Sequence, residues 1–302
     1  MIDITLLGTA ALFPLPDRAL TADFLSCGGR SILFDCGEGT QTAARKAHVS
    51  LMKTDLIALT HYHGDHVFGL PGLLQTMHSF GRTRPLYITG PAGLREALAP
   101  LLYLAGETCY EVRLANACEG TVPLPCFPAG AAVTCFPTEH RVPSQGYCFT
   151  LGRPGKFLPE RARALGVPPR LWGTLQKGES VSVDGSSISP EQVLGSPRRG
   201  LKIVFTGDTA ACDSLLRAAR EADLLISEAT FAGDEEEKAR EYGHMTFAQA
   251  ACLAAGADVR ELWLAHYSQT VRDPESALPE ARAYFENTVC GVDGMKKTLR
   301  FS

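Results

Sequence analysis

The sequence predicts an α/β protein. Short apolar runs typical of buried strands alternate with helix-like segments over most of the chain. The chain has 302 residues, of which 45% are hydrophobic, so it can bury a large core within one elaborated α/β domain or two halves. Several of the apolar runs end in histidine or aspartate, and loops that follow strands commonly carry the functional groups of a rigid scaffold.

The first half of the chain contains most of the predicted alternation. We expect strands at 4–9, 31–35, 56–59 and 85–89 and helices at 40–46, 72–79 and 93–104. Prolines predict a loop over 14–18, because proline and the residue before it disfavour helix. From 110 to 151 short β-like pieces alternate with proline and glycine, which predicts an antiparallel portion.

The last third of the chain continues the same alternation. We expect strands at 202–207, 224–228 and 261–266, a helix at 212–222, and a charged helix or loop at 235–242. Thr246 and Gln249 fit a capping box, which predicts that an alanine-rich helix begins there and runs to Ala255.

Residues 152–200 differ in character from the rest of the chain. Proline and glycine recur, and apolar periodicity is poor apart from a short helix near 159–165. Between Gly152 and Lys202 there are nine lysines and arginines against four acidic residues, about +5, while the whole chain carries −4 and the remainder therefore −9. This charge predicts either an anionic partner for one face or an ordinary solvated insertion.

The stretch from His61 to His66 predicts a metal site. His61 and His63 lie two residues apart on an extended segment, so their side chains point the same way. Gly64 can bend the backbone, which would turn Asp65 and His66 toward a second point. Imidazole and carboxylate ligands suit zinc and other borderline divalent ions. We therefore interpret this stretch as a metal site and not as a polar loop with scattered histidines.

Two later strands also end in potential ligands, Asp208 and His266. The first cluster alone exceeds the needs of one tetrahedral ion, which favours a pair of ions. Two ions about 3.5–4 Å apart can clamp the attacking and leaving oxygens of a displacement reaction.

Composition and cysteine usage suggest a protein of a reducing compartment. None of the ten cysteines forms a CxxC pair, so we expect buried free thiols and no cysteine zinc knuckle. The N-terminus lacks a basic region, and no apolar run approaches the roughly 20 residues of a membrane helix. We expect a cytoplasmic, soluble protein, and the net charge of −4 argues against a generic nucleic-acid coat.

The HxHxDH loop resembles that of the metallo-β-lactamase superfamily, and further motifs resemble its ribonuclease Z family, which trims the 3′ trailer from precursor tRNA. These motifs span nearly the whole chain and lie at 35–41, 60–66, 69–74, 205–209, 227–231 and 244–246. Residues 152–200 stand where this family carries a flexible arm that grips tRNA. Residues 167–173 and 175–179 are similar to the sequence of that arm.

The resemblance implies a four-layer αβ/βα sandwich: one metallo-β-lactamase domain over 1–302 with a basic arm inserted at 152–200 as a candidate tRNA-binding exosite. It implies two Zn²⁺ ions, with Mn²⁺ as an alternative, and a phosphodiesterase that acts through a dizinc-bound hydroxide. The ligands it implies are His61, His63 and His140 for one zinc, Asp65, His66 and His266 for the other, and Asp208 as a bridge.

The resemblance also implies roles for residues outside the ligand set. Asp65 would orient the attacking water and accept its proton. His244, paired with Glu228, would protonate the leaving oxygen; the alternative is a simple buried ion pair. The expected phosphate and RNA contacts are Ser268, Arg18, Arg153, Lys156, Arg170 and Lys177. The expected partners are precursor tRNA and a second copy of the chain, with no membrane and no DNA.

Three departures from the family pattern concern RNA positioning and leave the metal ligands intact. Of the family's Pro-x-Lys-x-Arg-Asn, only Pro14 and Arg18 match. Gln269 and Thr270 stand where an arginine is common, and the arm's Gly-Pro is replaced at 169–170. The rival interpretations are a small-molecule hydrolase (phosphodiesterase, aryl-sulfatase or thioesterase type), which has no use for a basic arm, and a silent RNA-binding module, against which the intact ligands argue.

Overall fold

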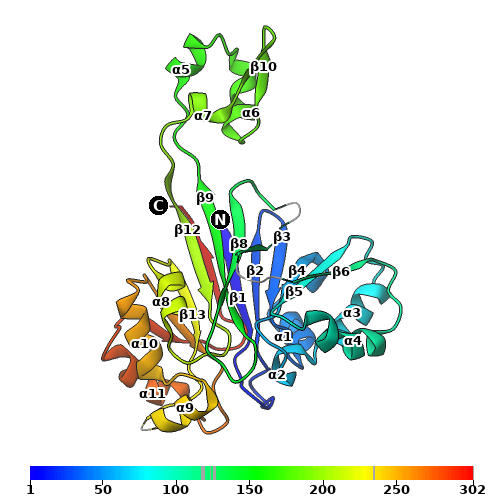
Figure 1. Ribbon diagram of the computed structural model, residues 1–302, viewed down its shortest axis with the longest axis vertical. Coiled ribbons are helices and arrows are strands. Elements are labelled where there is room, and N and C mark those ends of the chain that lie inside the picture. Colours follow the sequence, from blue (N-terminus) through cyan, green and yellow to red (C-terminus); the bar gives the residue numbers. More distant parts are fainter. Residues whose placement is uncertain (117–119, 123, 125–126, 234, 302) are drawn as a thin grey trace.

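Two mixed β-sheets packed face to face form the body of the protein, and helices cover their outer faces (Figure 1). The structure is a computed structural model that describes residues 1–116, 120–122, 124, 127–233 and 235–301. Within these residues each sheet has seven strands. The predicted α/β class and its four-layer arrangement of helix, sheet, sheet and helix are confirmed.

The first sheet is built from the N-terminal third of the chain and the C-terminal strand. Its central strands run parallel from β3 to β6, whereas β1 pairs antiparallel with both β2 and β16. The strand order is β16 (Lys296–Leu299), β1 (Ile2–Gly8), β2 (Ala22–Cys27), β3 (Arg30–Phe34), β4 (Thr54–Ala58), β5 (Leu86–Gly90) and β6 (Val112–Asn116).

The second sheet has a parallel half and an antiparallel half. Strands β12 to β15 are parallel, and β7, β8 and β9 join them antiparallel. The strand order is β15 (Thr288–Cys290), β14 (Leu262–Ala265), β13 (Leu224–Glu228), β12 (Arg198–Phe205), β9 (Gln145–Arg153), β8 (Ala131–Pro137) and β7 (Gly120–Val122).

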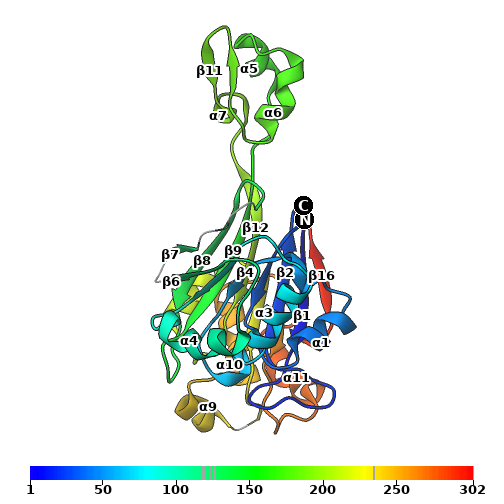
Figure 2. The same cartoon turned by 90° about the vertical axis from the view of Figure 1, so that its right-hand side faces the viewer.

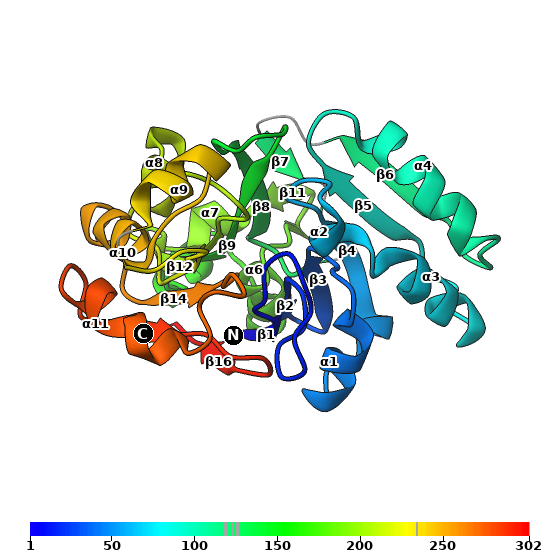
Figure 3. The ribbon, with the colours of Figure 1, turned by 90° about the horizontal axis from the view of Figure 1, so that it is seen from below.

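Helices pack on the outer face of each sheet through their apolar sides (Figures 1 and 3). The capping box at Thr246 forms as predicted: the Gln249 amide donates to Thr246 Oγ1 at 3.2 Å, and the Thr246 amide donates to Gln249 Oε1 at 3.0 Å. The first sheet carries α1 (Thr40–Lys46), η1 (Leu51–Lys53), α3 (Leu70–Ser79) and α4 (Leu94–Ala105), and the second α8 (Asp213–Ala219), α10 (Phe247–Gly256) and α11 (Pro274–Arg282). The helices α2 (Gly64–Val67) and α9 (Glu236–Tyr242) lie at the lower end of the molecule in Figure 1.

An aromatic contact joins the two sheets directly beneath the strand ends that matter for function. Phe34 at the end of β3 stacks on Phe205 at the end of β12, with ring centroids 3.8 Å apart, and both rings are buried. The loops that follow β3 and β12 are therefore held above one rigid support.

Two expectations from the sequence are wrong in part. The segment 110–151 is not uniformly antiparallel, because β6 pairs parallel with β5. Cys109 and Cys252 are exposed and not buried, whereas Cys27, Cys36, Cys135, Cys148 and Cys290 are buried as predicted. All the cysteines that the structure describes are free thiols; Cys118 and Cys126 lie outside the described residues.

Residues 154–197, which we call the arm, project beyond the end of the sheets on the extended strands β9 and β12 (Figures 1 and 2). The arm has a small core of its own, in which Ala162, Leu175 and Val193 are fully buried. Its elements are α5 (Pro159–Ala164), η2 (Pro169–Leu171), α6 (Trp172–Gln176), β10 (Val181–Val183), β11 (Ser186–Ile188) and α7 (Pro190–Val193).

The positive charge predicted for this region is shared between the arm and the body. Arg198, Arg199 and Lys202 lie on β12, and the Arg199 guanidinium forms an ion pair with Asp223 at 2.6 Å. The arm itself carries five basic residues against four acidic ones. Its charge is thus nearly balanced, and any attraction to an anion must come from how its lysines and arginines are placed.

None of the helices in the described part of the chain has the length and apolar character that a membrane crossing requires.

Candidate metal centre

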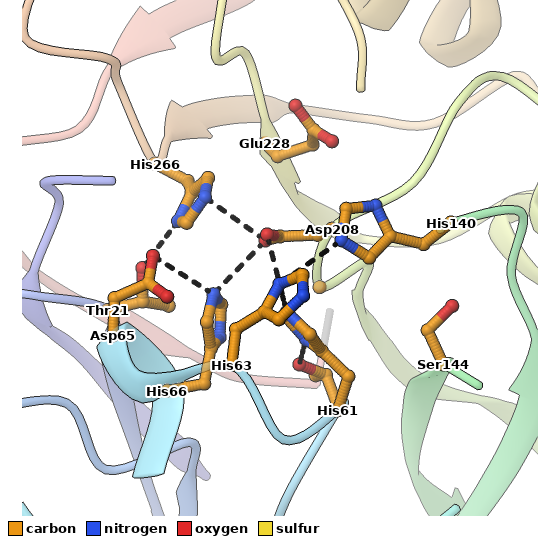
Figure 4. Close-up of polar contacts among 12 residues, drawn as sticks. Thr21, His61, His63, Asp65, His66, His140, Ser144, Asp208, Glu228 and His266 are labelled. Atoms are coloured by element: carbon orange, nitrogen blue, oxygen red, sulfur yellow. Dashed lines mark hydrogen bonds and ion pairs between the residues drawn. The ribbon is translucent and has the colours of Figure 1, made fainter. Parts of the chain in front are cut away.

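Five histidines and two aspartates converge where strands of both sheets end (Figure 4). β4 leads into His61 and His63, β12 leads into Asp208, and β14 leads into His266. Asp65 and His66 lie on the short helix α2, which begins at Gly64, and His140 follows β8. The site therefore draws its side chains from loops that two packed sheets hold in place.

His61, His63, His140 and Asp208 form the first group of potential ligands. His61 Nε2 lies 2.9 Å from His63 Nδ1, which lies 3.4 Å from His140 Nε2. Nitrogens bound to one tetrahedral zinc at about 2.0–2.1 Å would be roughly 3.3–3.4 Å apart. The observed spacing is close to what a shared cation imposes.

The second group consists of Asp65, His66 and His266, again with Asp208 beside it. Asp208 Oδ1 lies 3.3 Å from His66 Nε2 and 3.2 Å from His266 Nε2. Its other oxygen, Oδ2, lies 3.6 Å from His61 Nε2 in the first group. Asp208 thus faces both groups, one oxygen toward each.

Hydrogen bonds at the outer nitrogens fix how four of the histidines face the centre. His66 Nδ1 donates to Asp35 Oδ2 at 2.8 Å, and His140 Nδ1 donates to the Gly243 carbonyl at 2.9 Å. His61 Nδ1 lies 3.0 Å from Thr60 Oγ1, and His266 Nδ1 lies 2.6 Å from Thr21 Oγ1. In the neutral form of such a ring, with the proton on Nδ1, the Nε2 lone pair faces the centre, as in metal-binding histidines.

Two buried atoms at the heart of the site, His66 Nε2 and Asp208 Oδ1, have no hydrogen-bond partner among the residues that the structure describes. Burying polar atoms without partners is costly, and a bound cation would satisfy both. The donor set of imidazole nitrogens and carboxylate oxygens therefore fits one or two divalent ions.

Burial and neighbouring charges set the protonation of the ligands. Burial holds the pKa of His61 well below its ordinary value and also lowers the pKa of His63, which keeps both rings in the neutral, ligating form. Burial disfavours the Asp208 carboxylate, but His266 and His66 outweigh it and hold the pKa well below its ordinary range. Asp208 is therefore ionised and available to a metal.

His66 behaves differently in the absence of an ion. Burial lowers its pKa, but the carboxylates of Asp208 and Asp35 outweigh burial and raise the pKa well above its ordinary value. A metal that binds here must displace a proton from His66, so metal affinity depends on pH.

Glu228 and His244 form a buried pair beside the ligands. Glu228 Oε1 accepts a hydrogen bond from His244 Nδ1 at 2.8 Å, and Oε2 accepts one from Thr230 Oγ1 at 2.6 Å. Burial disfavours the imidazolium, but Glu228 outweighs burial and raises the pKa of His244 to about 9. The His244 ring lies 5.0 Å from that of His140, so a protonated imidazole stands at the edge of the centre.

A strained residue in the N-terminal loop positions Asp65. The Leu12 amide donates to Asp65 Oδ2 at 2.8 Å while Leu12 holds a φ of 65°, in the left-handed region. Burial raises the pKa of Asp65, but His66 and His266 outweigh it and lower the pKa overall. Asp35 and His266 also have positive φ, so three strained non-glycine residues belong to this site.

The residues predicted to contact RNA are placed in two distant regions. Arg18 Nη2 donates to the carbonyls of Val271 and Arg272 at 3.0 and 3.1 Å, so it anchors the N-terminal loop. Ser268 follows His266 closely, and its hydroxyl lies 2.5 Å from Thr270 Oγ1. The other four lie at the far end of β9 and β12 from the ligands, on or at the base of the arm: Arg153, Lys156, Arg170 and Lys177.

Several functional residues were not anticipated from the sequence. Asp35 follows a buried strand just as Asp208 and His266 do, so the same signal was available for it. Thr21, Thr60 and Gly243 carry no such signal, because each acts through contacts with residues from other loops or neighbouring positions.

Two family models match separate parts of the chain. Residues 175–267 match the family described as beta-lactamase superfamily domain, and residues 2–102 match the family described as anti-Pycsar protein Apyc1. The chain is 39% identical over 302 residues to the ribonuclease Z of Lachnospira eligens, covering 100% of this chain and 99% of the relative. It is 41% identical over 306 residues to that of Methanosarcina acetivorans, with the same coverage.

Solved structures agree with the sequence comparison. The short form of human tRNase Z is 28% identical and superposes with a TM-score of 0.68, covering 99% of this chain and 100% of the human chain. The metallo-β-lactamase fold protein YhfI from Bacillus subtilis reaches a TM-score of 0.71 at 22% identity, with 98% of each chain covered, which shows the fold alone. The predicted metallo-β-lactamase architecture is confirmed.

Proposed function

The chain belongs to the ribonuclease Z family of the metallo-β-lactamase superfamily and is a metal-dependent endoribonuclease; on this premise we propose that it cleaves the 3′ trailer from precursor tRNA with two Zn²⁺ ions. The observation that carries the proposal is the convergence of seven ligand side chains beside the Glu228–His244 pair. A cytoplasmic location follows from this substrate and is part of the proposal.

Two ions fit the two groups of ligands. His61, His63 and His140 would hold one, Asp65, His66 and His266 the other, and Asp208 would contact both. Imidazole-rich sites suit zinc, and Mn²⁺ is the alternative. When bound, such ions lower the pKa of water and stabilise the negative charge that develops on a phosphate undergoing displacement.

The protein's own groups then move the protons. Asp65, held by the Leu12 amide, orients the attacking water and accepts its proton as the new bond to phosphorus forms. The bond that breaks joins phosphorus to the 3′-oxygen of the tRNA, and His244 donates the proton that this oxygen needs. Glu228 keeps His244 protonated at neutral pH. The products are a tRNA with a 3′-hydroxyl and a trailer with a 5′-phosphate.

The position of the arm supports a homodimer that acts in trans. The arm joins the N-terminal end of β12, whereas Asp208 follows its C-terminal end. A strand of this length spans on the order of 25 Å, so the arm points away from the ligands of its own chain. We propose that the exposed Lys156, Arg170 and Lys177 hold a tRNA that the partner subunit cuts.

Incubating the zinc-loaded protein with a trailer-bearing tRNA and mapping the product ends tests the substrate. We expect one cut at the junction of tRNA and trailer, and none with Asp208→Ala. An intact RNA together with turnover of bis(p-nitrophenyl) phosphate would instead favour the small-molecule hydrolase.

Removing residues 153–197 tests the arm separately. We expect loss of tRNA cleavage with retained turnover of bis(p-nitrophenyl) phosphate; unchanged tRNA cleavage would refute the arm's role. Mixing the arm deletion with Asp208→Ala tests action in trans. Heterodimers combine one intact arm with one intact site, so we expect tRNA cleavage to return only in the mixture.

A further inference from the structure

A groove of about 810 Å³ opens beside the metal centre on the side of His140. The loop between β8 and β9 forms one wall, and Pro91 and Ala92, which follow β5, form part of the other. His140 itself lines the groove, so the groove is continuous with the first group of ligands. A polymer whose phosphodiester sits at the centre can extend into it.

The charge in the groove is one-sided. Among the described residues that line it, Arg141 and His140 are ionisable, and none is an aspartate or glutamate. Within the described part of the chain, Arg141 is exposed and has no ion-pair partner. A guanidinium in this setting is free to form a bidentate contact with a phosphate.

The Tyr242 ring also holds the Arg141 side chain in place. Its guanidinium carbon lies 5.3 Å from the centre of the Tyr242 ring, a cation–π geometry. The next residue of that turn, Gly243, accepts the hydrogen bond from His140 Nδ1. Ordering the long side chain in advance reduces the entropy that binding a phosphate would cost.

The position of His244 sets the 5′-to-3′ direction of the bound RNA. This residue comes two positions after Tyr242, and its ring lies 5.0 Å from that of His140. If His244 protonates the leaving 3′-oxygen, the nucleotide that carries this oxygen lies on the His244 side. Its own 5′-phosphate then points toward Arg141.

We propose that Arg141 binds the RNA phosphate immediately 5′ of the scissile one, and that Tyr242 is a positioning residue for it. This inference rests on the proposed function. It assigns the chain's preference for a polynucleotide over a simple phosphodiester in part to one side chain beside the metal centre, independently of the arm.

The test compares Arg141→Gln with the wild type on trailer-bearing tRNA and on bis(p-nitrophenyl) phosphate. We expect kcat/KM for tRNA to fall about tenfold relative to that for the small diester, mainly through KM. We also expect the slope of log affinity against log salt to decrease by about one. Arg141→Lys should restore part of the loss, and Arg240→Gln, an exposed arginine on the neighbouring helix α9, serves as the control.

A neutral methylphosphonate placed in the RNA tests the contact without changing the protein. A methylphosphonate at the position 5′ of the scissile bond should reduce cleavage by the wild type about tenfold. It should not reduce cleavage by Arg141→Gln any further. The same change on the 3′ side should affect both proteins equally.

Three outcomes would overturn the inference. One is an equal loss on both substrates in Arg141→Gln, which would mean that Arg141 only supports the His140 loop. The second is an equal effect of the 5′ methylphosphonate on both proteins. The third is an unchanged kcat/KM for tRNA in Arg141→Gln. Failure of the proposed function would look different, because the wild type would then not cut tRNA at all.

Discussion

Gly243 lies directly against His140. Its carbonyl accepts the hydrogen bond from His140 Nδ1 at 2.9 Å, and a Cβ at position 243 would come within 3.2 Å of both Cα and Nδ1 of His140. Its φ of +71° also lies in the left-handed region. Glycine is favoured here on two grounds, and its carbonyl links a metal ligand to the turn that carries His244.

We predict that Gly243→Ala weakens metal binding about 10- to 100-fold, because the new methyl group displaces His140 and its hydrogen bond. Competition with a coloured chelator measures the affinity. Gly81→Ala is the matched control, since its φ is +70° and a Cβ there meets no atom of the described part of the chain within 4 Å. Both variants should lose about 1 kcal/mol of unfolding free energy to backbone strain, but only Gly243→Ala should lose metal. Equal metal affinity in the two would contradict the role of the contact.

Asp35→Asn should impair the centre although Asp35 is not a ligand. Asp35 Oδ1 accepts from the Thr60 amide, and Oδ2 accepts from Thr60 Oγ1 and His66 Nδ1, all at 2.8 Å. The asparagine side chain has an NH₂ donor in place of one carboxylate oxygen. This NH₂ would face the N–H or O–H group that now donates to that oxygen. We expect metal affinity to fall about 10- to 100-fold with the fold retained. Circular dichroism checks the fold, and an affinity equal to that of the wild type would show that His66 is oriented by other contacts.

The sequence predicted the parts of the site that are local. The spacing from His61 to His66 carries both the strand end and the bend at Gly64, so a metal cluster could be inferred from this stretch alone. The strained backbone at Leu12, Asp35 and His266 could not, because a positive φ in a non-glycine residue is imposed by tertiary contacts. Thr21 and Gly243, which hydrogen-bond to His266 and His140, could not be predicted either, because these contacts also arise only in the folded protein.

The elements missed from the sequence have identifiable causes. α11 contains Pro279, which normally argues against helix, yet the Asp273 side chain caps its first turn and its apolar side is buried. β2 begins at Ala22 and Asp23, which are both buried, and the charged side chain of Asp23 interrupts the apolar pattern that would predict a strand. Gly28-Gly29 did mark the hairpin turn between β2 and β3. β15 has three residues and β16 has four, too few to show a clear apolar pattern, and each pairs with a strand that the sequence does predict, β14 and β1.

Glu228→Gln should shift the alkaline limit of RNA cleavage. His244 must be protonated to act as an acid, so activity is present below its pKa and is lost as pH rises through it. With Glu228 the pKa is about 9; without the carboxylate it should fall toward the ordinary value of about 6.5. The pH profile of kcat for tRNA measures the shift.

A substrate with a good leaving group provides the control for that prediction. Nitrophenolate needs no proton to depart, so the profile for bis(p-nitrophenyl) phosphate should not follow the pKa of His244. An alkaline limit that stays in place for tRNA in Glu228→Gln would leave the pair as a structural contact and remove His244 from the mechanism.

Leu12→Gly should stabilise the protein. The left-handed φ of 65° at Leu12 costs about 1–2 kcal/mol of backbone strain. Its side chain is 63% exposed, so it adds little stability through burial. Glycine removes the strain but has more freedom in the unfolded chain, so the net gain should be about 0.5–1 kcal/mol. Leu12→Ala is the matched control, because it keeps a Cβ and therefore the strain. Urea unfolding with an unchanged m-value measures both. If the urea midpoint of Leu12→Gly is no higher than that of Leu12→Ala, the loop relaxes around Leu12. The Leu12 amide then contacts Asp65 without backbone strain.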